Sequence, residues 1–110
     1  MKKIVFVLLI LVLVGCNTKK EVNKLDEILS KNNYIIVDVR TEEEYNTGHV
    51  KGSINIPYDV ISNSTLDKSK TILVYCKSGK RSKKAYDTLI DLNYDVYDLG
   101  GYSSITLEKE

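Results

Sequence analysis

The sequence lacks an excess of charge of either sign, and this lack excludes one class of partner. Its 110 residues carry 16 basic and 15 acidic side chains, a net charge of +1. A nucleic-acid-binding protein would show a broad basic excess, so nucleic acid is not an expected partner. Hydrophobic residues make up 43% and charged residues 28%, which excludes a disordered or collagen-like chain. The length suits one compact domain and not two.

The first fifteen residues are typical of a secretory signal and not of a folded domain. Lys2 and Lys3 precede eleven apolar residues, 4–14, and the small residue Gly15 follows. Eleven helical residues rise about 16 Å, roughly half of the ~30 Å hydrocarbon core of a bilayer. A permanent membrane-spanning helix is therefore the weaker interpretation, and we predict that residues 1–15 are removed.

The residues Leu13-Val14-Gly15-Cys16 resemble the bacterial lipobox, the recognition sequence of lipoprotein signal peptidase. This resemblance implies that Cys16 receives a diacylglycerol thioether and becomes the mature N-terminus. Residues 16–22 would then be the lipidated terminus and tether, and residues 23–110 the folded domain. Because two or more acyl chains anchor a protein stably, we expect it in the bacterial cell envelope, on the extracytoplasmic face of the membrane. The alternative is a simple cleaved signal with an incidental cysteine.

Cysteine is scarce, and this makes Cys76 informative. The chain has two cysteines, and if Cys16 is lipidated, Cys76 is the only thiol and no internal disulfide forms. In an exported protein, a lone free cysteine indicates a reactive group or an intermolecular partner.

Apolar patterning predicts an α/β domain with a small, largely parallel β-sheet flanked by helices. Strands are expected at residues 34–39, 53–57, 71–76 and 94–99, the last followed by two glycines. Helices are expected at residues 23–31, 41–48 and 82–92. Thr41 and Glu44 fit a capping box at the start of the second helix, which should end at Gly48. Strands that alternate with helical patterns favour a parallel sheet.

The carboxyl ends of the predicted strands carry the candidate site. Sites in parallel sheets form beyond these ends, where Cys76 follows one strand, and Asp38 and Arg40 lie at the end of another. The loop after Cys76 leads into a helix whose first N–H groups are unpaired, and it contains Lys77, Ser78, Gly79, Lys80 and Arg81. Such positive surroundings lower the pKa of a thiol and favour the nucleophilic thiolate. The alternative is a merely buried cysteine followed by solvent-facing lysines, which is how we interpret Lys83 and Lys84.

Two segments together resemble the rhodanese domain: YIIVDVRTEEEYNTGHVKGSINIPY (34–58) and ILVYCKSGKRSKKAYDTLIDLNYDVYDLGGY (72–102). The resemblance implies a sulfurtransferase that moves sulfane sulfur from thiosulfate or a persulfide donor to cyanide or a thiol. Cys76 would be the catalytic residue and form a persulfide, and the loop 77–81 would bind it. Asp38 and Arg40 would support the site as an ion pair, and His49 would be structural. No metal or cofactor is implied, and a protein acceptor is an allowed partner.

Three alternatives remain beside this interpretation. Phosphatases and arsenate reductases of related folds use a Cys-x5-Arg loop, but Arg81 gives Cys-x4-Arg, one residue too short for a tetrahedral phosphate. A non-catalytic binding module is the second alternative. The third is a surface persulfide carrier or thiol-redox protein, which would share the fold and Cys76. The residues after Tyr102 also depart from the family, because SSITLEKE is too short for its closing helix.

Overall fold

The computed structural model describes residues 24–110. The predicted signal peptide, the lipidated Cys16, the tether and Asn23 lie outside the described residues. Residues 24–31 are helical, as expected, and belong to a different unit from residues 33–110, which form the compact unit that holds the whole sheet. None of the helices among residues 24–110 is both long and apolar enough to cross a membrane.

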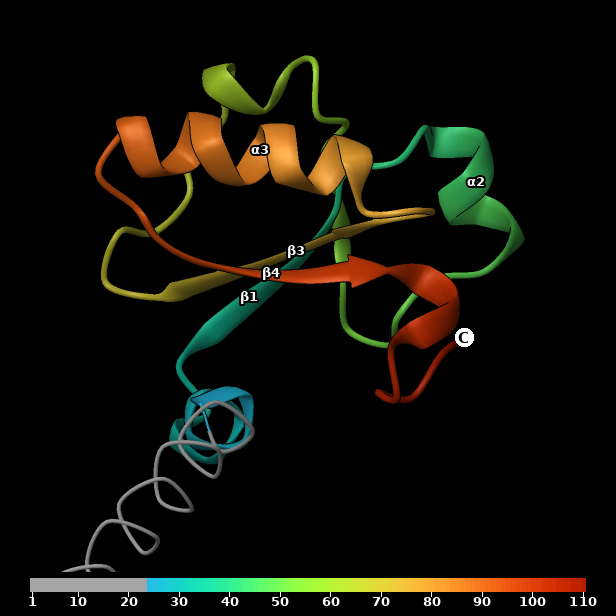
Figure 1. Cartoon of the computed structure of the whole chain (residues 1–110), viewed down its shortest axis with the longest axis horizontal. Helices are drawn as coiled ribbons and strands as arrows, with labels where there is room; N and C mark the ends of the chain where they lie inside the picture. Colours follow the sequence, from blue (N-terminus) through green and yellow to red (C-terminus); the bar gives the residue numbers. More distant parts are fainter. Residues whose placement is uncertain (1–23) are drawn as a thin grey trace, which may run out of the picture. The chain divides into compact units, whose positions relative to one another are not determined.

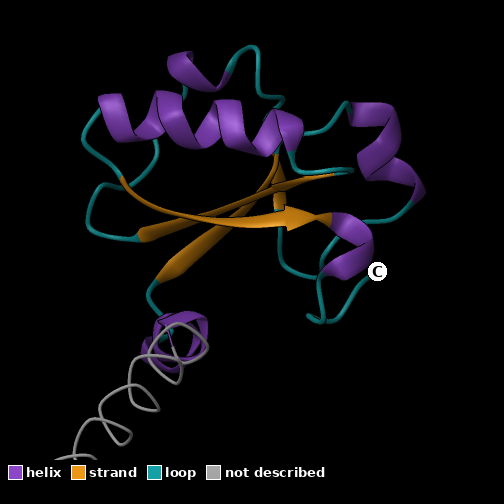
Figure 2. Cartoon of the chain, in the orientation of Figure 1, coloured by secondary structure: helices purple, strands orange, loops and turns teal. Residues whose placement is uncertain are grey.

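A four-stranded, all-parallel sheet forms the centre of residues 33–110 (Figures 1 and 2). The strands are β1 (Tyr34–Asp38), β2 (Ile54–Asn55), β3 (Thr71–Cys76) and β4 (Asp95–Gly101). Their spatial order is β2-β1-β3-β4, so β1 and β3 are the central strands. Both central strands are runs of mostly apolar residues because neighbouring strands and packed layers cover them. The predicted α/β fold with a parallel sheet is confirmed.

The helices α2 (Glu42–Thr47) and α3 (Lys80–Asp91) follow β1 and β3 along the chain. The predicted capping box is present: Glu44 N donates to Thr41 Oγ1 at 3.2 Å, and Thr41 N donates to Glu44 Oε1 at 3.2 Å. Gly48 ends α2 as predicted. α3 packs on β3 and β4 (Figure 1). It also contacts the short 3-10 helix η1 (Ile61–Asn63). A second 3-10 helix, η2 (Tyr102–Ser104), follows β4.

The core between the sheet and α3 consists of side chains that alternate along the strands. Its buried residues are Val37, Val39, Ile61, Ile72, Val74, Cys76, Ala85, Leu89, Tyr94 and Val96. Because side chains alternate between the two faces of a strand, Cys76 shares the α3 face with Ile72 and Val74, and Tyr75 points to the opposite face.

Three predicted elements had a boundary that was wrong by two residues. α3 begins at Lys80 and not at Ser82, because Gly79 takes a left-handed conformation (φ 97°) that turns the chain directly into the helix. The strand expected at 53–57 is limited to β2, residues 54 and 55. β4 does not stop at Leu99 but continues through Gly101, after a register shift opposite Val74 and Tyr75.

The residues after η2 extend back to the turn that follows α2. Val50 and Lys109 form an isolated antiparallel bridge, and His49 and Glu110 exchange backbone hydrogen bonds of 2.8 Å. The segment therefore pairs with the chain instead of adding a helix, in line with its shortness.

Candidate active site

Cys76 ends β3 with a fully buried side chain, 0% exposed, beneath the loop that leads to α3. The backbone N–H of Gly79 donates to Cys76 Sγ at 3.0 Å. The geometry follows from the left-handed Gly79, which turns the N–H groups of the loop inward. A strand end, a tight turn and a helix start therefore surround one sulfur atom.

The pKa of the Cys76 thiol results from two opposing effects. Burial raises it, but hydrogen bonds from the backbone and hydroxyl of Ser82 and from the backbones of Gly79 and Ser78 prevail, so the pKa lies below its usual value. The donors stabilise the thiolate because they bind negative charge. The thiol is thus prepared as a nucleophile mainly by the groups of the loop and of Ser82, and the charge of Arg81 also interacts favourably with a Cys76 thiolate.

β4 closes the loop from one side through Gly101. A Cβ atom at this position would lie 2.9 Å from Lys77 O and 3.5 Å from Ser78 Cα. Such contact with backbone atoms leaves room only for glycine. Gly101, the second of the two glycines after the predicted last strand, therefore serves close packing against the Cys76 loop, whereas Gly100 takes a left-handed conformation with φ 85°.

The cationic side chains of the loop differ in their surroundings. Arg81 is held by Glu44 of α2 in a two-point ion pair, with Nη1–Oε1 2.6 Å and Nη2–Oε2 3.0 Å. This hydrogen bonding to Arg81 lowers the pKa of Glu44 to about 2. Lys77, Ser78 and Lys80 are exposed. Lys83 and Lys84, which the sequence predicted to face solvent, are both exposed. Lys83 Nζ forms an ion pair with Asp87 Oδ1 at 2.7 Å.

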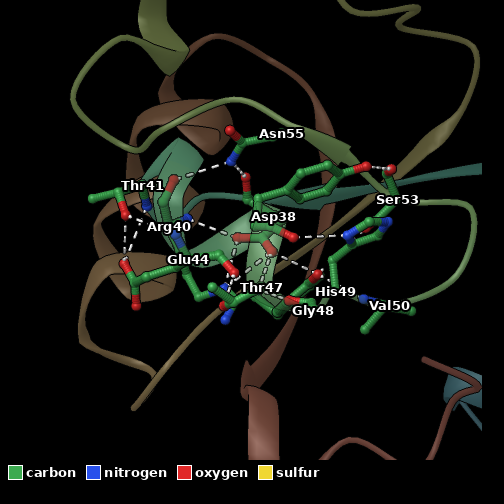
Figure 3. Close-up of polar contacts among 12 residues, drawn as sticks. Asp38, Arg40, Thr41, Glu44, Thr47, Gly48, His49, Val50, Ser53 and Asn55 are labelled. Carbon is green, nitrogen blue, oxygen red and sulfur yellow. Dashed lines mark hydrogen bonds and ion pairs between the residues drawn. The ribbon is translucent and has the colours of Figure 1, made fainter. Parts of the chain in front are cut away.

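Asp38 and Arg40 form the predicted ion pair, and both are buried, 0% and 5% exposed. The pair is joined by several hydrogen bonds, among them Arg40 Nη2 to Asp38 Oδ2 at 2.6 Å and Arg40 N to Asp38 Oδ1 at 2.9 Å. Arg40 Nη2 also donates to Gly48 O at 2.6 Å, so the guanidinium ties β1 to the end of α2 (Figure 3). The guanidinium carbon lies 4.5 Å from the centre of the Tyr102 ring.

Tyr75 places this ion pair on the opposite face of the sheet from Cys76. The Tyr75 hydroxyl donates to Asp38 Oδ2 at 2.7 Å and accepts from Val50 N at 2.9 Å. Burial raises the pKa of Tyr75 to about 12, so the phenol stays protonated. Because neighbouring residues of β3 point to opposite faces, the pair supports the strand ends and does not face the sulfur.

His49 contributes to the same structural region. Its ring stacks on Tyr45 with 3.8 Å between centroids, Nδ1 lies 2.8 Å from Tyr45 O, and Nε2 lies 3.2 Å from Glu110 Oε1. Nowhere in the range 24–110 do three His, Cys, Asp or Glu side chains gather where they could hold a metal ion. The chemistry that Cys76 and its loop can perform is nucleophilic attack by the Cys76 thiolate.

Sequence reasoning missed three contributors to the site. Ser82 is 0% exposed, lowers the pKa of the Cys76 thiol, and donates its hydroxyl to Gly79 O at 3.1 Å; the Cys-x-x-Gly-x-Arg-Ser spacing was the available signal. Glu44 was assigned only to the cap, since its partner Arg81 is 37 residues away. Gly101 was assigned to a strand end, and no local pattern indicated its approach to Lys77.

Comparisons with known proteins cover the same part of the chain. The family model of the rhodanese-like domain matches residues 21–108, which contain the whole sheet and the Cys76 loop. Thiosulfate sulfurtransferase PspE from Escherichia coli is 37% identical over 78 residues, covering 66% of this chain and 75% of that protein. A tRNA uridine(34) hydroxylase from Rickettsia typhi is 34% identical over 85 residues, which cover 69% of this chain but 34% of that protein. The solved structure of a rhodanese with anions from E. coli has a TM-score of 0.63 at 35% identity and covers 70% of this chain and 96% of that one.

Proposed function

The chain belongs to the rhodanese-like domain family, and from this premise we propose that it is a sulfurtransferase that carries sulfane sulfur on Cys76. The donor is thiosulfate or a persulfide, and the acceptor is cyanide or a thiol. The relatives include proteins named for thiosulfate sulfurtransfer and for tRNA hydroxylation. The hydroxylase is matched over a third of its length, so its name carries less weight for this chain.

The first step loads sulfur on Cys76. The thiolate attacks the outer sulfur of thiosulfate, a new S–S bond forms, and the sulfur–sulfur bond of thiosulfate breaks so that sulfite leaves with its electron pair. The product is the Cys76 persulfide anion. The lowered pKa of Cys76 favours the thiolate, so the step does not call for a separate general base. An acceptor then removes the outer sulfur and regenerates the thiolate.

One observation carries the proposal: Cys76 Sγ lies under inward-pointing loop N–H groups, with Gly79 N at 3.0 Å. Such N–H groups are suited to a persulfide anion, in the way that an oxyanion hole is suited to oxygen. The related E. coli rhodanese structure with anions is consistent with an anion-binding loop.

Phosphate chemistry is less well supported by the same loop. In addition to the short Cys-x4-Arg spacing, the Arg81 guanidinium is engaged by both carboxylate oxygens of Glu44. Its charge and two of its N–H groups are therefore already engaged within the domain.

The proposal is tested by intact mass. Incubating the purified full-length chain with thiosulfate should add the mass of one sulfur atom, and cyanide or a thiol should remove it. Cys76→Ser should show no gain, whereas Cys16→Ala, which changes the other cysteine, should keep it. Unchanged mass with thiosulfate and with small-molecule persulfides, while the thiol still reacts with iodoacetamide, would refute the proposal. Hydrolysis of an aryl phosphate that Cys76→Ser abolishes would favour the phosphatase instead.

We also propose that the chain is anchored in the bacterial cell envelope by lipid on Cys16, facing away from the cytoplasm. Support comes from the sequence: a charged start, eleven apolar residues and the Leu13-Val14-Gly15-Cys16 motif. A surface persulfide carrier with a protein acceptor is compatible with this location and with the same Cys76 chemistry.

A further inference from the structure

α3 begins with positive charge where helices usually carry negative charge. Its first turn contains no acid, and Lys80, Arg81, Lys83 and Lys84 lie within its first five residues. The N-terminus of a helix bears a partial positive charge, so these cations do not stabilise α3. Their concentration next to the Cys76 loop therefore calls for an explanation other than helix stability.

Two of these cations are neutralised within the domain, and others are not. Arg81 pairs with Glu44, and Lys83 pairs with Asp87. Among residues 24–110, no ion pair within 4.0 Å involves Lys77, Lys80 or Lys84, and all three side chains are exposed. The charges of Lys77, Lys80 and Lys84 are thus available to a binding partner.

The position of Lys84 connects this charge to the site. Its ammonium lies 5.7 Å from the centre of the Tyr58 ring. Tyr58 N donates to Val39 O at 3.0 Å, and Val39 N donates to Tyr75 O at 3.0 Å, next to Cys76. Tyr58 therefore lies at the carboxyl ends of β1 and β3. We name Lys77, Lys80, Lys84 and the half-buried Tyr58 the acceptor face.

We propose that the acceptor face binds an acidic protein whose own cysteine takes the sulfur from Cys76; this inference rests on the proposed function. Lys80 and Lys84 are one helical turn apart, about 6 Å, and Lys77 extends the charge across the loop. The charge therefore spreads beyond what one small anion such as thiosulfate contacts. Tyrosine is enriched at protein interfaces and charged residues are confined to their polar rim, so Tyr58 with lysines around it fits the edge of such an interface.

The transfer step explains why charge is useful here. The acceptor thiolate attacks the outer sulfur of the Cys76 persulfide, an S–S bond forms to the acceptor, and the bond to Cys76 Sγ breaks. Cys76 leaves as a thiolate, and the acceptor becomes the persulfide anion, so atoms and charge balance. Because two anions must approach each other, surrounding cations lower their repulsion and attract an acidic partner.

The test uses the full-length chain, loaded with thiosulfate and freed of excess donor. Acceptor probes are synthetic peptides with one cysteine flanked by glutamates, by glutamines or by lysines, and β-mercaptoethanol is the uncharged reference. The measured quantity is the rate of persulfide discharge to each peptide, divided by the rate to β-mercaptoethanol. The flanking charges of a peptide also change the reactivity of its own thiol. Comparing the ratio for the same peptide between protein variants cancels this effect.

For the glutamate peptide, Lys84→Glu should lower this ratio about fivefold, as expected when a rim charge is reversed. For the lysine peptide, the same variant should raise the ratio. Lys70→Glu is the matched control: it lies before β3, about 20 Å along the strand from Cys76, and should leave both ratios unchanged. Raising the salt concentration should bring the wild-type ratio toward that of Lys84→Glu.

Equal ratios in the wild type and Lys84→Glu would overturn the acceptor face. So would unchanged ratios combined with loss of binding to phosphatidylglycerol vesicles in Lys84→Glu, because the charge would then serve a membrane surface. Failure of Cys76 to load with sulfur is seen before any peptide is added, and it would refute the proposed function itself.

Discussion

At the scale of the residue, the state of Cys76 depends on donors that lie within hydrogen-bonding reach of its sulfur. The sequence predicted that the N–H groups of the loop, together with Lys77, Lys80 and Arg81, would ionise the thiol. In the structure, Gly79 N lies 3.0 Å from the sulfur, and the hydrogen bonds that lower the pKa of Cys76 come from Ser82, Gly79 and Ser78. The direction of backbone N–H groups is a property of the fold, so it was only partly predictable.

Ser82→Ala should raise the pKa of the Cys76 thiol because it removes a hydroxyl that lowers this pKa and that donates to Gly79 O at 3.1 Å, while the backbone donor of residue 82 is kept. Alkylation by iodoacetamide at neutral pH should slow roughly tenfold, as expected for loss of one hydrogen bond to a charged group. The pH profile of the alkylation rate should shift toward higher pH.

Ser78→Ala is the matched control, since Ser78 acts on the thiol through its backbone N–H, which alanine retains. Its pH profile should coincide with that of the wild type. A Ser82→Ala profile that also coincides with the wild type would show that the hydroxyl has no part in ionising Cys76.

At the scale of the element, α2 and α3 are joined by a single residue with two tasks. Glu44 completes the capping box of α2 and also holds Arg81 in the first turn of α3. The sequence predicted the capping box because its partners are three residues apart. It did not predict the ion pair, because residues 44 and 81 meet only once the sheet has brought β1 and β3 side by side.

The Glu44–Arg81 pair should make stability depend on pH. The pKa of Glu44 falls from 4.5 to about 2 in the folded protein, so its contribution is fully present above 4.5 and is lost as the pH falls through about 2. Glu44→Gln should lower the free energy of unfolding at neutral pH by about 1 kcal/mol, a value suited to a partly exposed pair. The difference from the wild type should shrink between pH 4.5 and 2 in urea titrations.

Glutamine is accepted in a capping box, so Glu44→Gln should retain the cap of α2. Glu43→Gln removes the same charge from an exposed neighbour that has no part in the Arg81 pair, and its loss of stability should be smaller. A pH-independent difference for Glu44→Gln would contradict the role of the pair.

At the scale of the whole molecule, sequence patterns predicted the order of the elements better than their contacts. β3 matched its predicted span, because an apolar run covered on both faces is recognisable without tertiary information. The Asp38–Arg40 pair was also predicted, but not that Tyr75 holds it on the opposite face from Cys76. The start of α3 was misplaced because the left-handed Gly79, and not a side-chain cap, starts the helix.

The location of the chain in the cell is a separate prediction about the whole molecule. Metabolic labelling with a radioactive fatty acid should label the wild type, and Cys16→Ala should remove the label. Cys76→Ser should keep the label because it leaves the Leu13-Val14-Gly15-Cys16 motif intact. An unlabelled wild type would mean that Cys16 is an incidental cysteine after a simple signal.

The contact between Gly101 and the Cys76 loop also limits how the site can evolve. Lengthening the loop by one residue would produce a Cys-x5-Arg spacing, but β4 packs on the loop so closely that even a Cβ atom on Gly101 would lie 2.9 Å from Lys77 O. An insertion alone would therefore be expected to disrupt the loop instead of creating a phosphate site. A change of substrate class in this scaffold would require coordinated changes at two distant places in the gene.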